Sequence, residues 1–166
     1  METLTHHSFV DRIKGAALLD VATYEEVEAD TGATMEAGGV IALVAIAGAI
    51  GAIGHGNNAV LAGLVSGIVG WGLWAGITYI VGDKLLGGTA SWGELLRTLG
   101  FAQAPALLLV FGIIPGLHLL VGLVVAIWTL ITGIVAIRQA LDFGTGKAIV
   151  TALFSAIILA VIRLFF

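Results

Sequence analysis

Six charged side chains that could act as acids, bases or ion-pair partners lie at ends of apolar segments that are predicted to share one face. They are Asp83, Lys84, Glu94, Arg97, Arg138 and Asp142. An enzyme acting on lipids needs such acid and base groups clustered at one interface. Ordinary helix ion pairs account for the set better, because Arg138 and Asp142 stand four positions apart. We therefore expect no catalytic residue, and a lipid-modifying enzyme is the less favoured alternative.

Histidines and one glycine-rich segment form a second set of candidates. His55 and His118 fall in loops at the ends of the apolar runs that lie away from these six charged residues. A zinc site needs further ligands, and no carboxylate lies near the two histidines. The chain has no cysteine to supply a thiolate. Residues 144–147 (GTGK) match the end of a phosphate-binding loop, yet Leu141 and Ala148 replace its first glycine and its final Ser or Thr. We expect no metal and no cofactor, and the sequence leaves open whether the two histidines meet.

Composition indicates that membrane helices hold these side chains. Of 166 residues, 59% are hydrophobic and 11% are charged, whereas a soluble domain has about 25% charged residues. Five apolar runs approach the ~20 residues that a membrane-spanning helix needs. They cover residues 37–54, 59–81, 92–114, 117–137 and 148–166. The predicted fold is all-α, a polytopic membrane protein. Five transmembrane helices are expected in residues 37–166. The preceding segment, residues 1–36, is expected to contain one or two short cytoplasmic or interfacial amphipathic helices.

Basic residues predict which way the chain crosses the membrane. Six of the seven lie before the first run, at the junction of runs two and three, or at the junction of runs four and five, and only Arg163 lies elsewhere. Cytoplasmic loops collect Lys and Arg, so we expect the N-terminus in the cytoplasm and the C-terminus outside. The first run begins near Ala37, too far along the chain for a cleavable signal peptide. The expected location is the cytoplasmic (inner) membrane, with the lipid bilayer as a partner.

The middle of every apolar run lacks an ionisable residue. Charges inside a membrane usually mark ion paths or proton relays, so we expect neither a pump nor a proton-coupled transporter. A small oligomeric channel or transporter stays open as an alternative if polar side chains converge on one axis. The candidates for that path are Ser66, Thr78, Gln103 and Thr129. Otherwise we expect buried hydroxyls to bond to their own helix backbone, and no basic stripe suits a nucleic acid.

The polar N-terminal segment contains two predicted helices. An apolar stripe within residues 9–19 predicts an amphipathic helix in the cytoplasmic interface, and an acidic helix follows around residues 24–30. Helix-start signals are Ser8 with Asp11, Thr23 with Glu26, and Ser91 with Glu94 further on. The acidic face is either solvated or a docking surface for a cytoplasmic partner or a neighbouring subunit. The possible docking residues are Tyr24, Glu25, Glu26, Glu28 and Asp30.

Glycines indicate how the predicted membrane helices pack. Small residues four positions apart let helix backbones approach closely, and the second run holds two such pairs. They are Gly63 with Gly67, and Gly72 with Gly76. We expect the first two membrane helices to be the tightest pair. The deeper tryptophans are expected to be plain packing residues; they are Trp71, Trp74 and Trp128.

The third run must begin early to cross the membrane. Residues 101–114 alone are too short for a spanning helix, so the helix is expected to start at Trp92. Arg97 then extends toward the inner face. Pro105 kinks this helix, Gln103 caps carbonyls at the kink, and neighbouring helices satisfy the remaining freed carbonyl.

Seven short blocks along the chain form a recognisable set. They are residues 9–15 (FVDRIKG), 24–30 (YEEVEAD), 71–74 (WGLW) with Tyr79 and Gly82, 96–105 (LRTLGFAQAP), 112–116 (GIIPG), 127–128 (IW) and 138–142 (RQALD). Together they resemble prokaryotic members of the Yip-domain family (Ypt/Rab-interacting proteins). The resemblance implies a five-helix membrane protein without assigned chemistry. Eukaryotic relatives interact with Rab-type GTPases in vesicle traffic, but this chain lacks their long cytoplasmic N-terminal region, so small GTPase binding is not expected.

These features favour a non-enzymatic integral membrane protein that acts as a scaffold, organiser or accessory subunit. Its expected partners are other membrane proteins or further copies of itself, contacted through glycine-rich helix faces. The acidic N-terminal segment is expected to lie at the cytoplasmic surface.

Overall fold

The computed structural model describes residues 7–53 and 60–165, and for residues 60–66 and 163–165 it describes the backbone only. The described part is all-α, as predicted. Its elements are α1 (Phe9–Ala17), α2 (Val21–Ala29), α3 (Ala33–Gly51), α4 (Val60–Tyr79), the π-helix η1 (Ile80–Leu85), α5 (Trp92–Phe101), the 3₁₀-helix η2 (Ala104–Ile113), α6 (His118–Ala140) and α7 (Thr145–Phe165).

Four segments among the described residues are long and apolar enough to cross a membrane. They are Ala33–Gly51, Trp92–Ile113, His118–Ala140 and Thr145–Ile162. They correspond to the first, third, fourth and fifth apolar runs of the sequence. The chain is therefore a multi-pass membrane protein.

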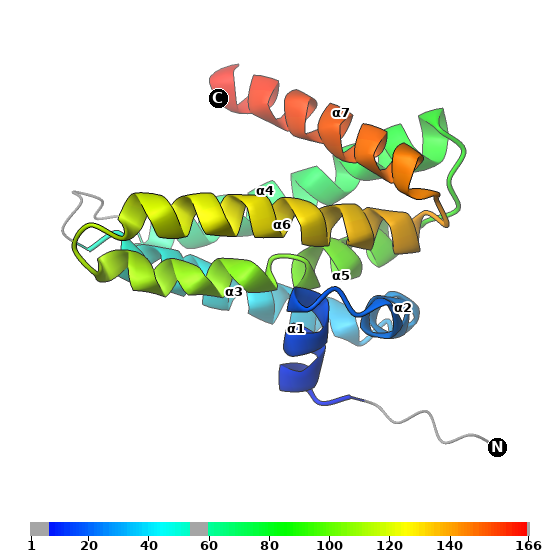
Figure 1. The fold of residues 1–166 in the computed structure, drawn as a ribbon. Coiled ribbons are helices and arrows are strands. Elements are labelled where there is room, and N and C mark those ends of the chain that lie inside the picture. The colour runs from blue at the N-terminus through cyan, green and yellow to red at the C-terminus, as the bar shows by residue number, and fades with distance from the viewer. Residues whose placement is uncertain (1–6, 54–59, 166) are drawn as a thin grey trace.

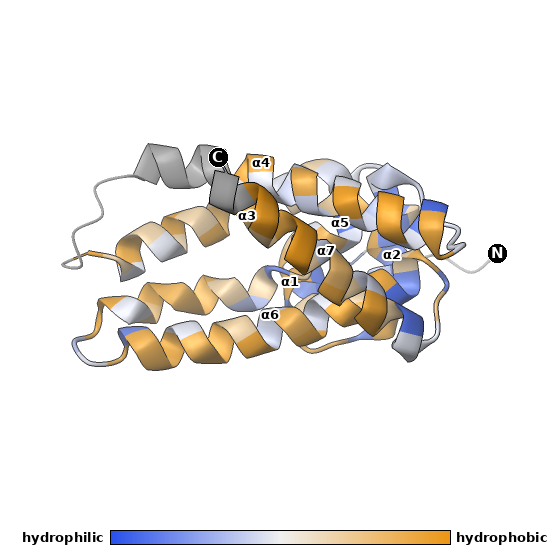
Figure 2. Cartoon of the chain, turned by 90° about the horizontal axis from the view of Figure 1, so that it is seen from above, coloured by the Kyte–Doolittle hydropathy of each residue, from blue (hydrophilic) through white to orange (hydrophobic). Residues whose placement is uncertain are grey.

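The long helices form a bundle, and α1 and α2 lie across its axis toward one end, with α1 nearer the middle (Figure 1). The same end holds the loop from η1 to α5 and the loop from α6 to α7. Hydrophilic residues gather mainly there, whereas the long helices are mostly hydrophobic (Figure 2). We call this the charged end; it includes Arg97, Arg138 and Asp142.

The buried core is richest where α2, α5 and α6 meet at the charged end. Its fully buried members there are Tyr24, Val27, Leu95, Leu99 and Ile137. The two short N-terminal helices therefore belong to the same hydrophobic core as the membrane helices. Apolar side chains on their inner faces contribute to that core, which stabilises their attachment.

Side chains define the starts of the short helices. Ser8 caps α1 by accepting a hydrogen bond from the Asp11 amide at 3.2 Å, as predicted. The predicted capping box of Ser91 and the glutamate three residues later is also confirmed at the start of α5. The predicted box at Thr23 is wrong, because α2 begins one turn earlier, at Val21. Asp20 caps it by accepting from the Thr23 amide and hydroxyl, which leaves Glu26 available for other contacts.

The third span is broken, as the proline predicted. α5 ends at Phe101, and η2 starts at Ala104 with Pro105 as its second residue. The hydroxyl of Thr132 on α6 donates to the carbonyl of Ala102 at 2.7 Å, so a neighbouring helix satisfies the interrupted backbone. Gln103 is the N-cap residue of η2 and makes no side-chain capping bond to the amides of this helix; its expected role, capping carbonyls at the kink, stays a prediction.

Glycine packing differs from the predicted pattern. A Cβ on Gly51 would lie 1.9 Å from the carbonyl oxygen of Leu109, so α3 and η2 approach each other most closely. Within the described residues, α3 contacts η2 more extensively than it contacts α4, and the expectation that α3 and α4 would be the tightest pair is wrong. Gly51 meets the backbone of η2 itself, at the carbonyl of Leu109 and at the Cα of Gly112.

The four glycines singled out on α4 have different surroundings. A Cβ on Gly67 would meet α3 side chains at 3.7–4.0 Å, and one on Gly76 would meet the Trp92 indole at 3.7 Å. A Cβ on Gly72 would have no described atom within 4 Å. Gly63 falls among the residues described by their backbone only.

Candidate functional site: the N-terminal helix pair

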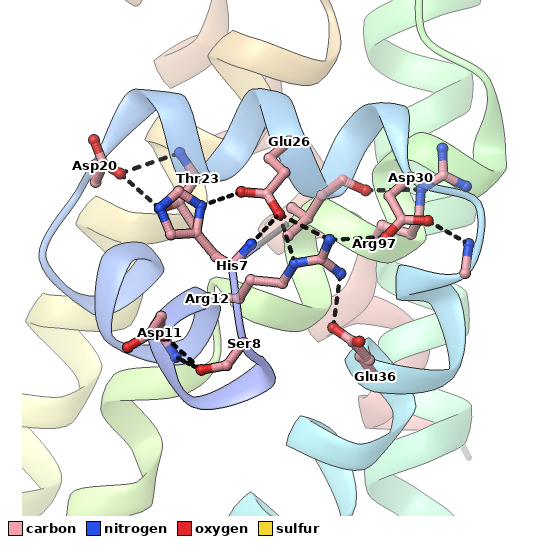
Figure 3. Close-up of polar contacts among 12 residues, drawn as sticks. His7, Ser8, Asp11, Arg12, Asp20, Thr23, Glu26, Asp30, Glu36 and Arg97 are labelled. Carbon is pink, nitrogen blue, oxygen red and sulfur yellow. Dashed lines mark hydrogen bonds and ion pairs between the residues drawn. The ribbon is translucent and has the colours of Figure 1, made fainter. Parts of the chain in front are cut away.

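α1 and α2, residues 7–30, form a unit that we call the helix pair, and Arg12 joins it to the bundle. The Arg12 side chain is 2% exposed and meets carboxylates from two elements. Its Nη2 lies 2.8 Å from an oxygen of Glu26 and 2.8 Å from an oxygen of Asp30, both on or next to α2. Its Nη1 lies 2.9 Å from an oxygen of Glu36 on α3. One guanidinium therefore links α1, α2 and α3 (Figure 3).

The network suits arginine because a planar guanidinium can donate to several carboxylates at once. Burial alone would lower the pKa of Arg12, but the hydrogen bonds that it donates to Asp30, Glu26 and Glu36 outweigh burial and raise the pKa above its ordinary value. Burial would raise the pKa of Glu26, but contacts with His7 and Arg12 lower it. Both pKa shifts favour the charged forms of Arg12 and Glu26.

His7 extends the network toward the solvent. Its backbone N–H donates to Oε1 of Glu26 at 3.1 Å, and its ring Nδ1 contacts Oε2 of the same carboxylate. The hydrogen bond and the charge of Glu26 raise the pKa of this exposed imidazole above 6.5. The pairing of His7 with Glu26 spans 19 residues and was not visible in the sequence.

A second arginine holds the end of α2. Arg97 on α5 is buried, and its Nε donates to the carbonyls of Val27 and Glu28 at 3.0 and 3.1 Å. These are carbonyls of the last helical turn, which no amide within α2 can satisfy. Arg97 thus supplies donors to the carbonyl end of α2, which has no basic residue of its own in its last turn. The expectation that Arg97 extends toward the inner face stays a prediction.

Two aromatic side chains complete the attachment. The Tyr24 hydroxyl donates to the carbonyl of Ala16 at 3.0 Å and ties α2 to α1. The Trp128 indole N–H donates to the carbonyl of Ala17 at 2.8 Å and ties α1 to α6. Trp128 was predicted to be plain packing, and its role depends on a contact 111 residues apart in sequence that no local pattern reveals.

An acidic cleft of about 290 Å³ lies between α2, α5 and the end of α6. It is lined by Glu25, Glu28, Ala29, Glu94, Gln139 and Asp142. The Gln139 amide donates to Glu25 at 3.2 Å. Burial raises the pKa of Glu28 to about 7, with Glu94, Asp142 and Glu25 adding to the increase and Arg97 opposing it. No group of three or more His, Asp or Glu residues in the described ranges is placed to hold a metal ion.

The predicted docking residues divide into three kinds in the structure. Tyr24 is fully buried and offers no surface to a partner. Glu26 and Asp30 bind Arg12. Glu25 and Glu28 line the acidic cleft, so these two carry what remains of the predicted docking surface.

The charged residues considered for chemistry do not gather into one cluster. Asp83 pairs with its neighbour Lys84 at 2.8 Å. Arg138 donates to Gln139 at 2.9 Å, and Asp142 accepts from Thr89 at 2.7 Å, in place of the predicted pair between Arg138 and Asp142. His118 starts α6, while its expected counterpart, His55, lies outside the described residues.

The chain matches the family model of the Yip1 domain over residues 31–165. The match starts just before α3, so it includes Glu36 and Arg97 but not the helix pair that they contact. Searches of curated proteins and of solved structures each found no match. Five of the seven sequence blocks lie within the matched region, and those at residues 9–15 and 24–30 lie before it. Because the match covers most of the chain, this protein belongs to the Yip1 domain family.

Proposed function

We propose that this protein is a non-enzymatic membrane protein that acts as a scaffold, organiser or accessory subunit for other membrane proteins. The observation that supports it best is the fixed helix pair. Arg12 and Arg97 hold the pair against α3 and α5, so its exposed residues keep a constant position relative to the membrane helices. A surface held in this way loses little conformational entropy when a partner binds.

The proposal includes five membrane crossings, with α4 as the additional span. Its 20 residues, Val60–Tyr79, contain no charged residue and match the ~20 residues needed to cross a bilayer. α4 also packs beside α3, α5 and α7. Five crossings put Lys84, Arg97 and Arg138 on the side of the helix pair, which the distribution of basic residues assigns to the cytoplasm. The proposed location is the cytoplasmic membrane.

The acidic cleft is the proposed contact for a partner outside the bilayer. Four carboxylates line it, and Glu25 is exposed at its rim. A partner with Lys or Arg side chains suits this surface, because complementary charge speeds association and selects among partners.

The proposed contact within the bilayer is the face of α4 around Gly72. No described atom lies within 4 Å of a Cβ placed there, so a second helix backbone could approach closely. This face fits either another membrane protein or a second copy of the chain.

The test places a photo-crosslinking amino acid at Glu25 in the full-length protein in cells. The matched control is the same substitution at Lys14, which is exposed on α1. After mild-detergent purification, native sizing and mass spectrometry identify what is attached. We expect a defined membrane protein in fixed ratio at Glu25 and not at Lys14. A homo-oligomer with no other protein would contradict the accessory-subunit proposal and favour the channel alternative.

A further inference from the structure

The turn between α1 and α2 exposes two leucines. Leu18 is 74% exposed and Leu19 is 36% exposed. α1 ends in a Schellman motif, in which the Asp20 amide donates to Gly15 and the Leu19 amide donates to Ala16. Leu19 has a φ of +66°, the left-handed conformation that usually selects glycine. A strained and exposed leucine at this position calls for a contact that the isolated chain does not supply.

The turn lies beside the lipid-facing part of α6. Trp128, which binds the carbonyl of Ala17, is flanked on α6 by Ile127 and Ile131, both of them exposed. His118 and Arg138 are 20 residues apart on α6, which corresponds to ~30 Å of helix, the thickness of the hydrocarbon core. Trp128 lies 10 residues from Arg138, and therefore ~15 Å from that charged side chain along the helix.

The orientation of α1 agrees with this depth. It runs across the bundle axis and lies nearer the middle of the bundle than α2 (Figure 1). Val10 and Leu18 lie on its outer side, whereas Arg12 and Ala16 face the core. A helix that lies across the spanning helices runs parallel to the membrane plane at the depth of Trp128.

The charges near the turn favour acyl chains over anionic headgroups. Arg12 is engaged by three carboxylates, and Asp20 binds Thr23. Asp11 and Lys14 are exposed on α1 and offset each other in charge. The turn therefore presents no excess of positive charge to attract an anionic lipid.

We propose that Leu18 and Leu19 insert into the acyl-chain region of one leaflet, beside Ile127 and Ile131. The helix pair is then anchored on two sides, by Arg12 to the bundle and by the two leucines to lipid. This inference rests on the proposed membrane placement of the five-helix domain. It assigns to the turn a lipid contact on the cytoplasmic side alone.

The absence of cysteine from the chain allows a clean test by site-specific labelling. Leu18→Cys and Leu19→Cys variants of the full-length protein are labelled with a nitroxide and reconstituted into phosphatidylcholine vesicles. Electron paramagnetic resonance then compares accessibility to oxygen, which concentrates in lipid, with accessibility to a water-soluble nickel chelate. Ile127→Cys is the lipid control, and Ala22→Cys, on the exposed side of α2, is the aqueous control.

We expect both leucine labels to resemble Ile127, with an oxygen-to-nickel ratio several-fold above that of Ala22. Labels at Leu18 and Leu19 that resemble Ala22, with Ile127 still lipid-like, would overturn the inference and leave the membrane placement intact. Nickel access at Ile127 would overturn the placement itself, and the inference with it. Lipid-like behaviour that appears only after phosphatidylserine is added would indicate headgroup binding instead of acyl-chain contact.

Discussion

Replacing Arg12 with methionine should release the helix pair from the bundle while the membrane helices stay folded. Methionine has a similar length and keeps an apolar stem, but it removes the cation that joins α1 to α2 and α3. Three carboxylates then face one another without a counter-charge. Their side chains are 20%, 26% and 36% exposed, so water reaches each of them in part.

The size of the effect follows from this partial exposure. Removing one partner of a buried ion pair costs about 3–5 kcal/mol. Exposed pairs contribute far less because solvent screens them, so the low end, about 3 kcal/mol, fits carboxylates that are only partly buried. Since each 1.4 kcal/mol is a factor of ten, opening of the helix pair should become about 100-fold more frequent.

Hydrogen–deuterium exchange of the full-length protein in lipid nanodiscs measures this opening directly. Peptides from α1 and α2 should lose protection by about 100-fold, and those from α6 should not change. Lys14→Met is the matched control, because Lys14 is an exposed cation on the same helix. Arg12→Lys should give an intermediate loss, since a single ammonium cannot reproduce the planar fork. Unchanged protection of α2 in Arg12→Met would falsify the proposed role of the network.

Four further predictions concern other parts of the chain. Gly51→Ala should destabilise the protein by about 1–3 kcal/mol, because the added Cβ would meet a backbone carbonyl. Gly72→Ala should be neutral or stabilising. Thermal unfolding in detergent compares the two variants, and equal losses of stability would contradict the packing account. Thr78→Val should stabilise by up to about 1 kcal/mol in the same assay, because its buried hydroxyl has no hydrogen-bond partner among the described residues; a loss of stability would mean that the hydroxyl is used. Protection of α2 should fall as pH rises from 4.5 to about 7, because the raised pKa of Glu28 lets the folded state hold a proton that the unfolded state has released. Hydrogen exchange measured across this pH range should lose that dependence in Glu28→Gln. The pKa of His7 is also raised, so His7 should account for any further loss of α2 protection above pH 6.5. A steeper pH dependence in the variant would refute the assignment to Glu28.

Local patterns predicted the features that depend on neighbours in sequence. Four of the five predicted apolar runs correspond to helices long and apolar enough to span, and Ser8 and Ser91 marked the starts of α1 and α5 correctly. Pro105 marked the break in the third span. Each of these depends on length, composition or a spacing of a few residues, and such signals survive in a single sequence.

The candidate site depended on contacts that no local spacing contains. Arg97 binds α2 carbonyls about 70 residues away, and Trp128 binds α1 across 111 residues. Glu26 was assigned to a helix cap, but Asp20 occupies that role and releases Glu26 to Arg12. The Glu26 carboxylate can either complete a capping box or bind Arg12. Only the tertiary arrangement decides which of the two contacts it makes.

The break in the third span changes how its length relates to its residue count. η2 has ten residues in 3₁₀ geometry, which rises ~2.0 Å per residue, so it covers ~20 Å where an α-helix of the same residues would cover ~15 Å. Rewinding η2 as an α-helix would shorten this one span by ~5 Å. Winding, and not the number of apolar residues, therefore sets the hydrophobic match of this span to the bilayer. On length alone, the shorter α form matches a thinner hydrocarbon core and the 3₁₀ form a thicker one.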